Sequence, residues 1–263
     1  MPVSGKQYIA TFFSFSSSRI LSPCRLGYSS RCIESIVFGS PVLDGGQAQY
    51  VRVPKAGGTL FNLSNPETWT TALSPEEKVK ALAGLHDSSL LLLADILPTG
   101  MFAALQAINH PKLQPMFTGI PWPLCLSPEL TNYPATELKP TLEDRILTIA
   151  IIGLGPVGIC AAVSLVDVLA TRKVSYRIIA VDRLPSRREK MMDVFSAIGP
   201  SGKGNGVFNA LDMDGAKAFA KEWTGGLGCN AVLEVGRSIV PAMIYESSFS
   251  AGGWTSGCVA FSL

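Results

Sequence analysis

The residues best suited to chemistry form a glycine-rich run, Gly153-Leu154-Gly155-Pro156-Val157-Gly158, with the spacing G-x-G-x-x-G. The run follows an apolar stretch, 146–152, and opens a second one that continues to residue 170. Between a strand and a helix, such a turn lets a diphosphate approach the backbone and meet the free N–H groups of the helix. Gly153, Gly155, Pro156, Val157 and Gly158 are therefore predicted to bind a dinucleotide. The alternative is a glycine turn that binds nothing.

A carboxylate and a basic cluster follow the next apolar run, 177–181. Asp182 stands where a carboxylate can accept hydrogen bonds from the adenosine ribose hydroxyls and repel a 2'-phosphate, which favours NAD. Arg187 lies among basic residues that could hold a 2'-phosphate, so NADP stays open as a cofactor. Without a ligand, Asp182 would cap a loop and Arg187 would lie on a solvated helix face.

The elements that must position these residues alternate regularly from residue 146 onward. Buried strands are typical of apolar runs and helices of the segments between them, so the alternation predicts an α/β fold. We expect a doubly wound parallel-sheet (Rossmann) domain over residues 146–263. The predicted strands are 146–152, 177–181, 207–211, 230–235 and 255–261, and the predicted helices are 156–170, 185–198 and 214–223.

Upstream, the composition changes twice. Residues 1–110 are a mixed region in which alternation predicts a strand over 50–53, and Ser74 with Pro75 predicts a helix start. Residues 111–145 hold seven of the 18 prolines, at 111, 115, 121, 123, 128, 134 and 140. A long helix cannot form through them, so this segment is predicted to be a surface connection or lid between two domains.

Composition narrows the class of protein. A 47% hydrophobic content suits a folded core, and 22 basic against 20 acidic residues provides no field for a nucleic acid or an anionic membrane. Six scattered cysteines indicate a reducing compartment, and we expect a cytoplasmic protein. The stretch 146–170 is long enough to span a membrane, but its central glycines and proline favour a strand, a turn and a helix. Residues 1–18 resemble a weak signal peptide without a clear cleavage site.

Four stretches, taken in order, resemble the zinc-containing medium-chain alcohol dehydrogenase family, and within it the formaldehyde-dehydrogenase-like branch. They are Cys24–Cys32, Gly45–Pro54, Leu93–Gly100 with its D-I-L-P-T-G motif, and Ile152–Gly158. The resemblance implies a GroES-like β-rich catalytic domain, here partial, ahead of the Rossmann domain. It also implies hydride transfer between a nicotinamide cofactor and an alcohol, aldehyde or ketone, assisted by zinc.

The same resemblance assigns individual residues. It maps a catalytic zinc ligand onto Asp95 and a residue near the nicotinamide onto Thr99. A carboxylate in an apolar segment also suits a cation, because burying it unpaired is costly, although Asp95 could instead be a helix cap or turn residue. Cys24 and Cys32 map onto the end of a structural zinc loop, with Ser18 and Leu21 at its other two positions. Two thiolates cannot complete that site, and we expect free thiols.

The sequence also departs from the family. The early cysteine and the G-H-E histidine that complete the catalytic zinc site do not occur, and His86 and His110 are expected to lie on the surface or at helix ends. The family's beginning and its last strand are also absent, so the chain looks truncated at both ends and its oligomeric state is open. Besides a zinc-type dehydrogenase, an inactive nucleotide-binding fragment and a zinc-free reductase fit these residues.

Overall fold

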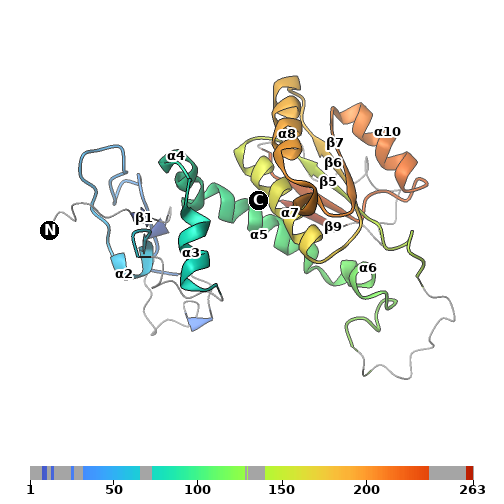
Figure 1. Ribbon diagram of the computed structural model, residues 1–263, viewed down its shortest axis with the longest axis horizontal. Helices are drawn as coiled ribbons and strands as arrows, with labels where there is room; N and C mark the ends of the chain where they lie inside the picture. The colour runs from blue at the N-terminus through green and yellow to red at the C-terminus, as the bar shows by residue number, and fades with distance from the viewer. Residues whose placement is uncertain are drawn as a thin grey trace. The chain divides into compact units, whose positions relative to one another are not determined.

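The computed structural model describes residues 8–10, 13–14, 25–26, 32–65, 73–127, 129, 140–236 and 259–262. The chain divides into two compact units, Met1–Pro98 and Thr99–Leu263 (Figure 1). The division falls inside helix α5 (Ile96–Ile108), ahead of residue 110, where the sequence predicts the first domain to end. Residues 99–110 group with the second unit because the small, apolar side chains of α5 are buried in its core.

The described part of the first unit contains short strands and short helices. Its strands pair antiparallel, β1 (Tyr8–Ala10) with β4 (Leu60–Asn62) and β2 (Phe13–Ser14) with β3 (Ile36–Val37). The predicted strand over 50–53 is wrong: these residues pair with no described strand, and Tyr50 is 84% exposed. The GroES-like domain stays a prediction. The helices are α2 (Ala56–Thr59), α3 (Pro75–Leu82), α4 (Asp87–Leu90) and the 3-10 helix η3 (Leu91–Ala94).

Helix α3 begins where the sequence predicts. The Ser74 hydroxyl accepts a hydrogen bond from the Glu77 N–H at 3.2 Å, and the Glu77 carboxylate accepts one from the Ser74 N–H at 2.8 Å. This reciprocal pair satisfies two N–H groups that the first turn of a helix leaves without partners.

The second unit is built on a parallel five-stranded sheet, as the alternation of elements predicts. Its strand order is β7-β6-β5-β8-β9, and the chain order reverses between β5 and β8. This is the order of a Rossmann-type sheet over its first five strands. The strands are β5 (Leu147–Ile152), β6 (Tyr176–Val181), β7 (Gly206–Leu211), β8 (Ala231–Glu234) and β9 (Val259–Ser262).

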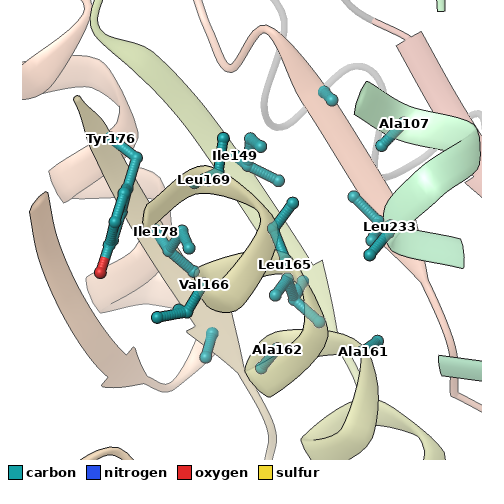
Figure 2. Packing of buried hydrophobic residues seen from close by; sticks show 14 of the residues in the cluster. Ala107, Ile149, Ala161, Ala162, Leu165, Val166, Leu169, Tyr176, Ile178 and Leu233 are labelled. Atoms are coloured by element: carbon teal, nitrogen blue, oxygen red, sulfur yellow. The ribbon is translucent and has the colours of Figure 1, made fainter. Parts of the chain in front are cut away.

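Helices cover both faces of this sheet. Helices α5, α7 (Pro156–Thr171) and α8 (Pro185–Ala197) contribute to the larger core cluster, and α10 (Met213–Trp223) contributes to a second cluster on the opposite face. Figure 2 shows Leu165 and Leu169 of α7 beside the strand residues Ile149 and Ile178. A sheet wound on both faces buries its central strands, which is why the run 147–152 in β5 is apolar at nearly every position. A short helix, α9 (Pro200–Lys203), precedes β7.

Helices α5 and α7 approach each other closely at Gly100. A Cβ added to Gly100 would lie 2.5 Å from the backbone nitrogen of Ala161 and 2.8 Å from the Cβ of Cys160. Only glycine fits there. The glycine of the D-I-L-P-T-G motif therefore has a packing role in this fold.

The proline-rich segment is partly folded. It forms the 3-10 helix η4 (Pro111–Leu113) and the short helix α6 (Gln114–Thr118), and Leu113 is fully buried in the core. Arg145 donates hydrogen bonds from Nε to the Met116 carbonyl and from Nη2 to the Phe117 carbonyl, each at 3.2 Å. Helices stay short here, as the prolines predict, but the first part of the segment is packed against the core.

Residues 146–170 form a strand, a turn and most of a helix, as the glycines predict. Among the described helices, none is by itself long and apolar enough to cross a membrane. Asp87–Ala94 and Ile96–Ile108 satisfy length and composition only when they are taken together across a 49° bend.

Candidate dinucleotide-binding site

The turn between β5 and α7 requires glycine at its first position. Gly153 has a φ of +95°, which side-chain-bearing residues rarely adopt. A Cβ there would also lie 2.7 Å from the Cα of Gly236. The Gly153 N–H donates to the Val181 carbonyl at 2.8 Å, which fixes the turn to the end of β6.

The other two glycines have different surroundings. A Cβ at Gly158 would clash with the Gly153 carbonyl oxygen, so packing within the protein excludes any side chain there. A Cβ at Gly155 would meet nothing within 4 Å, and its φ of −70° suits any residue. The protein's own packing therefore does not explain Gly155, and the space beside it is open to a ligand.

The N terminus of α7 faces this turn with free donors. Pro156, the first helical residue, has no N–H, and the first intrahelical bond runs from the Ile159 N–H to the Gly155 carbonyl at 2.9 Å. The N–H groups of Val157 and Gly158 lie ahead of that bond, so they have no partner inside the helix. With the positive end of a 16-residue helix behind them, they form an anion site of the kind that holds diphosphates.

Asp182 follows β6 directly and is bound to the glycine turn. Its Oδ2 accepts a hydrogen bond from the Leu154 N–H at 2.8 Å, and its Oδ1 accepts one from the Leu184 N–H at 2.9 Å. Burial alone would raise the pKa of the Asp182 carboxyl. The two N–H groups and the Arg187 guanidinium together outweigh burial and hold this pKa below its ordinary value. The carboxylate is charged and already oriented beside the turn.

Arg187 pairs with this carboxylate. Its Nη1 lies 3.3 Å from the Asp182 Oδ2, and its side chain is half exposed. Arg188 donates from Nη1 to the Asp182 and Arg183 carbonyls at 2.8 and 3.0 Å. The structure thus brings Asp182 and Arg187 together beside the predicted glycine turn, and Arg188 supports the loop that carries them.

Sequence reasoning noted Glu234 only as the start of Glu234-Val235-Gly236, which is one residue shorter than the family's E-A-V-G pattern, and did not assign it to the site. It is the last residue of β8, only 8% exposed, and burial raises the pKa of its carboxyl. No hydrogen bond or ion pair joins it to another side chain in the described part of the chain. An acidic residue at the carboxyl end of an apolar strand was the signal that could have revealed it.

Other elements carry the residues assigned by resemblance. Asp95 is exposed at the end of η3 and belongs to the first unit, so burial gives it no need for a cation. Thr99 is half-buried and belongs to the second unit, next to Gly100, which packs on α7. Cys32 is buried, and Cys24 lies outside the described residues.

The described residues do not provide a metal centre. Within them, no group of three or more His, Cys, Asp or Glu side chains could hold a metal ion. His110 caps η4, since its Nδ1 accepts a hydrogen bond from the Lys112 N–H at 3.2 Å. Burial, with the nearby Lys112 charge, lowers its pKa. His86 is exposed just before α4. Both histidines lie at helix ends, as the sequence predicts.

The chain is similar to two curated dehydrogenases. It is 32% identical over 213 residues to zinc-type alcohol dehydrogenase B of Aspergillus flavus, covering 81% of this chain and 36% of that protein. It is 30% identical over 201 residues to the medium chain reductase/dehydrogenase ucsI of an Acremonium species, covering 73% of this chain and 53% of that protein. No family model matches the chain. The chain thus spans between about a third and about half the length of these relatives.

Two solved structures resemble it more remotely. The D-arabinose dehydrogenase of Sulfolobus solfataricus is 18% identical with a TM-score of 0.48, over 86% of this chain and 49% of that one. The short chain alcohol dehydrogenase rspB of E. coli CFT073, in complex with NADH, is 17% identical with a TM-score of 0.45, over 98% of this chain and 60% of that one.

The likeness to the two curated relatives agrees with the coarser part of the resemblance seen in the sequence. The two curated relatives are named as a zinc-type alcohol dehydrogenase and a medium chain reductase/dehydrogenase. The formaldehyde-dehydrogenase-like branch stays a prediction.

Proposed function

We propose that the chain is a nicotinamide-dependent oxidoreductase of the zinc-type, medium-chain alcohol dehydrogenase family. Its substrate would be a small alcohol, aldehyde or ketone. The proposal is supported by the names of the two curated relatives and by the strand order and glycine turn of the second unit. When bound, the cofactor supplies the hydride donor or acceptor.

One observation carries the cofactor assignment: the open space at Gly155. Gly153 and Gly158 are explained by the turn and by packing, whereas the space at Gly155 is open and lies at the N terminus of α7, where an approaching diphosphate would meet no protein atom. A diphosphate there would accept hydrogen bonds from the Val157 and Gly158 N–H groups and would lie at the positive helix end.

Asp182 supports NAD over NADP. An ionised carboxylate offers about four acceptor positions, and three are taken by Leu154, Leu184 and Arg187. One position on Oδ1 is left for a ribose hydroxyl, and a second hydroxyl would have to displace the exposed Arg187. A 2'-phosphate would face the Asp182 charge, although Arg187, once displaced, could pair with it.

Zinc does not fit the described donors, so no reaction step is assigned to it. Within the described residues Asp95 is exposed and no donor trio surrounds it. By resemblance alone, Asp95 stays a proposed zinc ligand and Thr99 a proposed neighbour of the nicotinamide, and Cys24 and Cys32 are proposed remnants of a structural zinc loop. A cytoplasmic location is likewise a proposal, based on cysteine usage.

The test is binding first and turnover second. The purified chain is titrated with NAD and NADP by calorimetry, its zinc content is measured, and hydride transfer is followed by nicotinamide absorbance with simple alcohols and aldehydes. NAD binding with turnover and about one zinc per chain supports the full proposal. Turnover without metal identifies a zinc-free reductase, and binding without turnover an inactive nucleotide-binding fragment. Failure to bind either dinucleotide refutes the proposal.

A further inference from the structure

Asn205 is the one asparagine in the chain that a glycine follows. An asparagine side chain loses its amide nitrogen when the backbone nitrogen of the next residue attacks its Cγ. Glycine obstructs this attack least, because it has no side chain. Gly206 is the first residue of β7, and both Asn205 and Gly206 are exposed. The sequence context and the exposure of Asn205 thus favour this reaction.

Packing requires the glycine of this pair. A Cβ added to Gly206 would lie 2.5 Å from the ring of Tyr176, on the neighbouring strand β6. That ring is buried, and its hydroxyl donates a hydrogen bond to the Lys203 carbonyl at 2.6 Å. Since the ring is held at both its faces and its hydroxyl, a side chain at position 206 does not fit. The fold therefore keeps glycine after Asn205.

The attacking nitrogen faces the edge of the sheet. Strand β7 stands at one end of the strand order, and β6 is its neighbour among the described strands. The Asn205 carbonyl accepts a hydrogen bond from the Tyr176 N–H at 3.2 Å, so it points toward β6. In a trans peptide the carbonyl and the following N–H point in opposite directions, so the Gly206 N–H points away from β6. Pairing with β6 therefore does not hold this nitrogen.

We propose that Asn205 is a site of spontaneous deamidation in the folded protein. The Gly206 nitrogen attacks the Asn205 Cγ and forms a C–N bond. The side-chain nitrogen leaves as ammonia, taking up the proton that the Gly206 nitrogen loses, and a cyclic imide remains. Water then opens the imide, and no oxidation or reduction takes place. The proposal does not depend on a bound dinucleotide.

The hydrolysis has two products with different structural effects. Attack of water at Cγ restores the main chain with aspartate at position 205, and its carboxylate can accept a hydrogen bond from the Ser175 hydroxyl. Attack at the backbone carbonyl leaves the main chain running through the former side chain as isoaspartate. This product has an extra methylene in the backbone and no longer has the carbonyl that binds the Tyr176 N–H. Isoaspartate should therefore weaken the start of β7.

One side-chain contact restrains the reaction. The Asn205 Nδ2 donates a hydrogen bond to the Ser175 Oγ at 2.8 Å, at the protein surface. This bond limits the rotation of the side chain toward the Gly206 nitrogen. A hydrogen bond of this kind contributes about 0.5–1.5 kcal/mol, so it slows the reaction without preventing it.

The experiment follows deamidation of the purified chain at mildly alkaline pH. Peptide mass spectrometry measures conversion at each asparagine, and enzymatic methylation quantifies isoaspartate. We expect conversion at Asn205 to exceed that at Asn109, which is also exposed and hydrogen-bonded, to Arg172 at 3.5 Å, but precedes a histidine. Ser175→Ala should accelerate conversion at Asn205 about two- to tenfold, the effect of one lost hydrogen bond. Asn205→Gln should remove the isoaspartate signal.

Urea separates the effect of the fold from that of the sequence. In the unfolded chain Ser175→Ala should leave the rate at Asn205 unchanged, because the hydrogen bond is absent there. Conversion at Asn205 no faster than at Asn109, no acceleration by Ser175→Ala in the folded protein, or an equal acceleration in urea would each overturn the inference.

Thermal melting tests the structural consequence. Protein enriched in isoaspartate should melt below the variant Asn205→Asp, which carries the same charge on an unaltered main chain. Equal melting temperatures would overturn the expected weakening of β7.

Discussion

Two glycines three residues apart should respond oppositely to the same small change. Gly155→Ala places a methyl group where no atom lies within 4 Å, at a φ of −70° that alanine adopts readily. Gly158→Ala places its methyl group in collision with the Gly153 carbonyl oxygen. We expect the first change to block the ligand and the second to disturb the fold.

The magnitudes follow from these surroundings. Replacing a glycine by alanine where the backbone tolerates it stabilises a protein by about 0.4–1 kcal/mol, because the unfolded chain loses freedom. Gly155→Ala should therefore not lower the melting temperature. If a methyl group there keeps the diphosphate from the Val157 and Gly158 N–H groups, two charged hydrogen bonds are lost, about 3 kcal/mol or a hundredfold in affinity. Gly158→Ala should cost about 1–3 kcal/mol of stability, as overpacking does.

Calorimetric titration with NAD checks the expected loss of affinity, and thermal melting of the free proteins checks the expected change in stability. Gly155→Val is the stronger form of the first change and should remove measurable binding. If Gly155→Ala and Gly155→Val bind NAD as the wild type does, the open space at Gly155 is not the diphosphate site. If Gly155→Ala instead melts well below the wild type, the space is filled in solution and the geometric argument is wrong.

Three other changes test neighbouring parts of the second unit. Asp182→Ala should narrow any preference for NAD over NADP, measured by titration. It should also weaken the binding of both cofactors, because the Leu154 N–H loses its acceptor. An unchanged preference would remove Asp182 from the cofactor site. Gly100→Ala should lower the melting temperature, since its methyl group would lie 2.5 Å from the Ala161 nitrogen, whereas Gly57→Ala meets nothing and serves as the control. Burial raises the pKa of Glu234, so the folded state binds that proton more tightly than the unfolded state and loses stability as pH rises. Urea unfolding should therefore show that Glu234→Gln has a higher free energy of unfolding than the wild type, by an amount that grows from about pH 4 upward and is absent in acid. A difference that does not change with pH would contradict this.

Periodicity predicted the second unit well because its central strands, β5 and β8, are buried on both faces. An apolar run such as 147–152 has few other interpretations once Gly153 and Pro156 interrupt it. The start of α3 at Ser74 was equally predictable from the sequence, because a capping residue acts within one helical turn. Local signals of this kind need no knowledge of the rest of the chain.

Where tertiary context decides, the sequence misled. Residues 50–53 alternate like a strand but have no partner strand among the described residues, and alternation cannot supply one. Helix α5 was assigned to the first domain because the prolines that follow it suggested a boundary. Its placement depends on the contact between Gly100 and Ala161, residues far apart in the sequence. The burial expected of Asp95 likewise required knowing which face of its segment meets solvent, and that residue is exposed.

The two carboxyls at the edge of the sheet show most clearly what sequence alone leaves undecided. Asp182 follows the apolar strand β6 and Glu234 ends the apolar strand β8, so the same pattern describes both. Backbone donors and a guanidinium lower the pKa of Asp182, and burial raises the pKa of Glu234. Asp182 is thus oriented by the protein before any ligand arrives, and its replacement must disturb the turn as well as the cofactor. Glu234 lacks such partners among the described residues, so its replacement removes no described side-chain hydrogen bond.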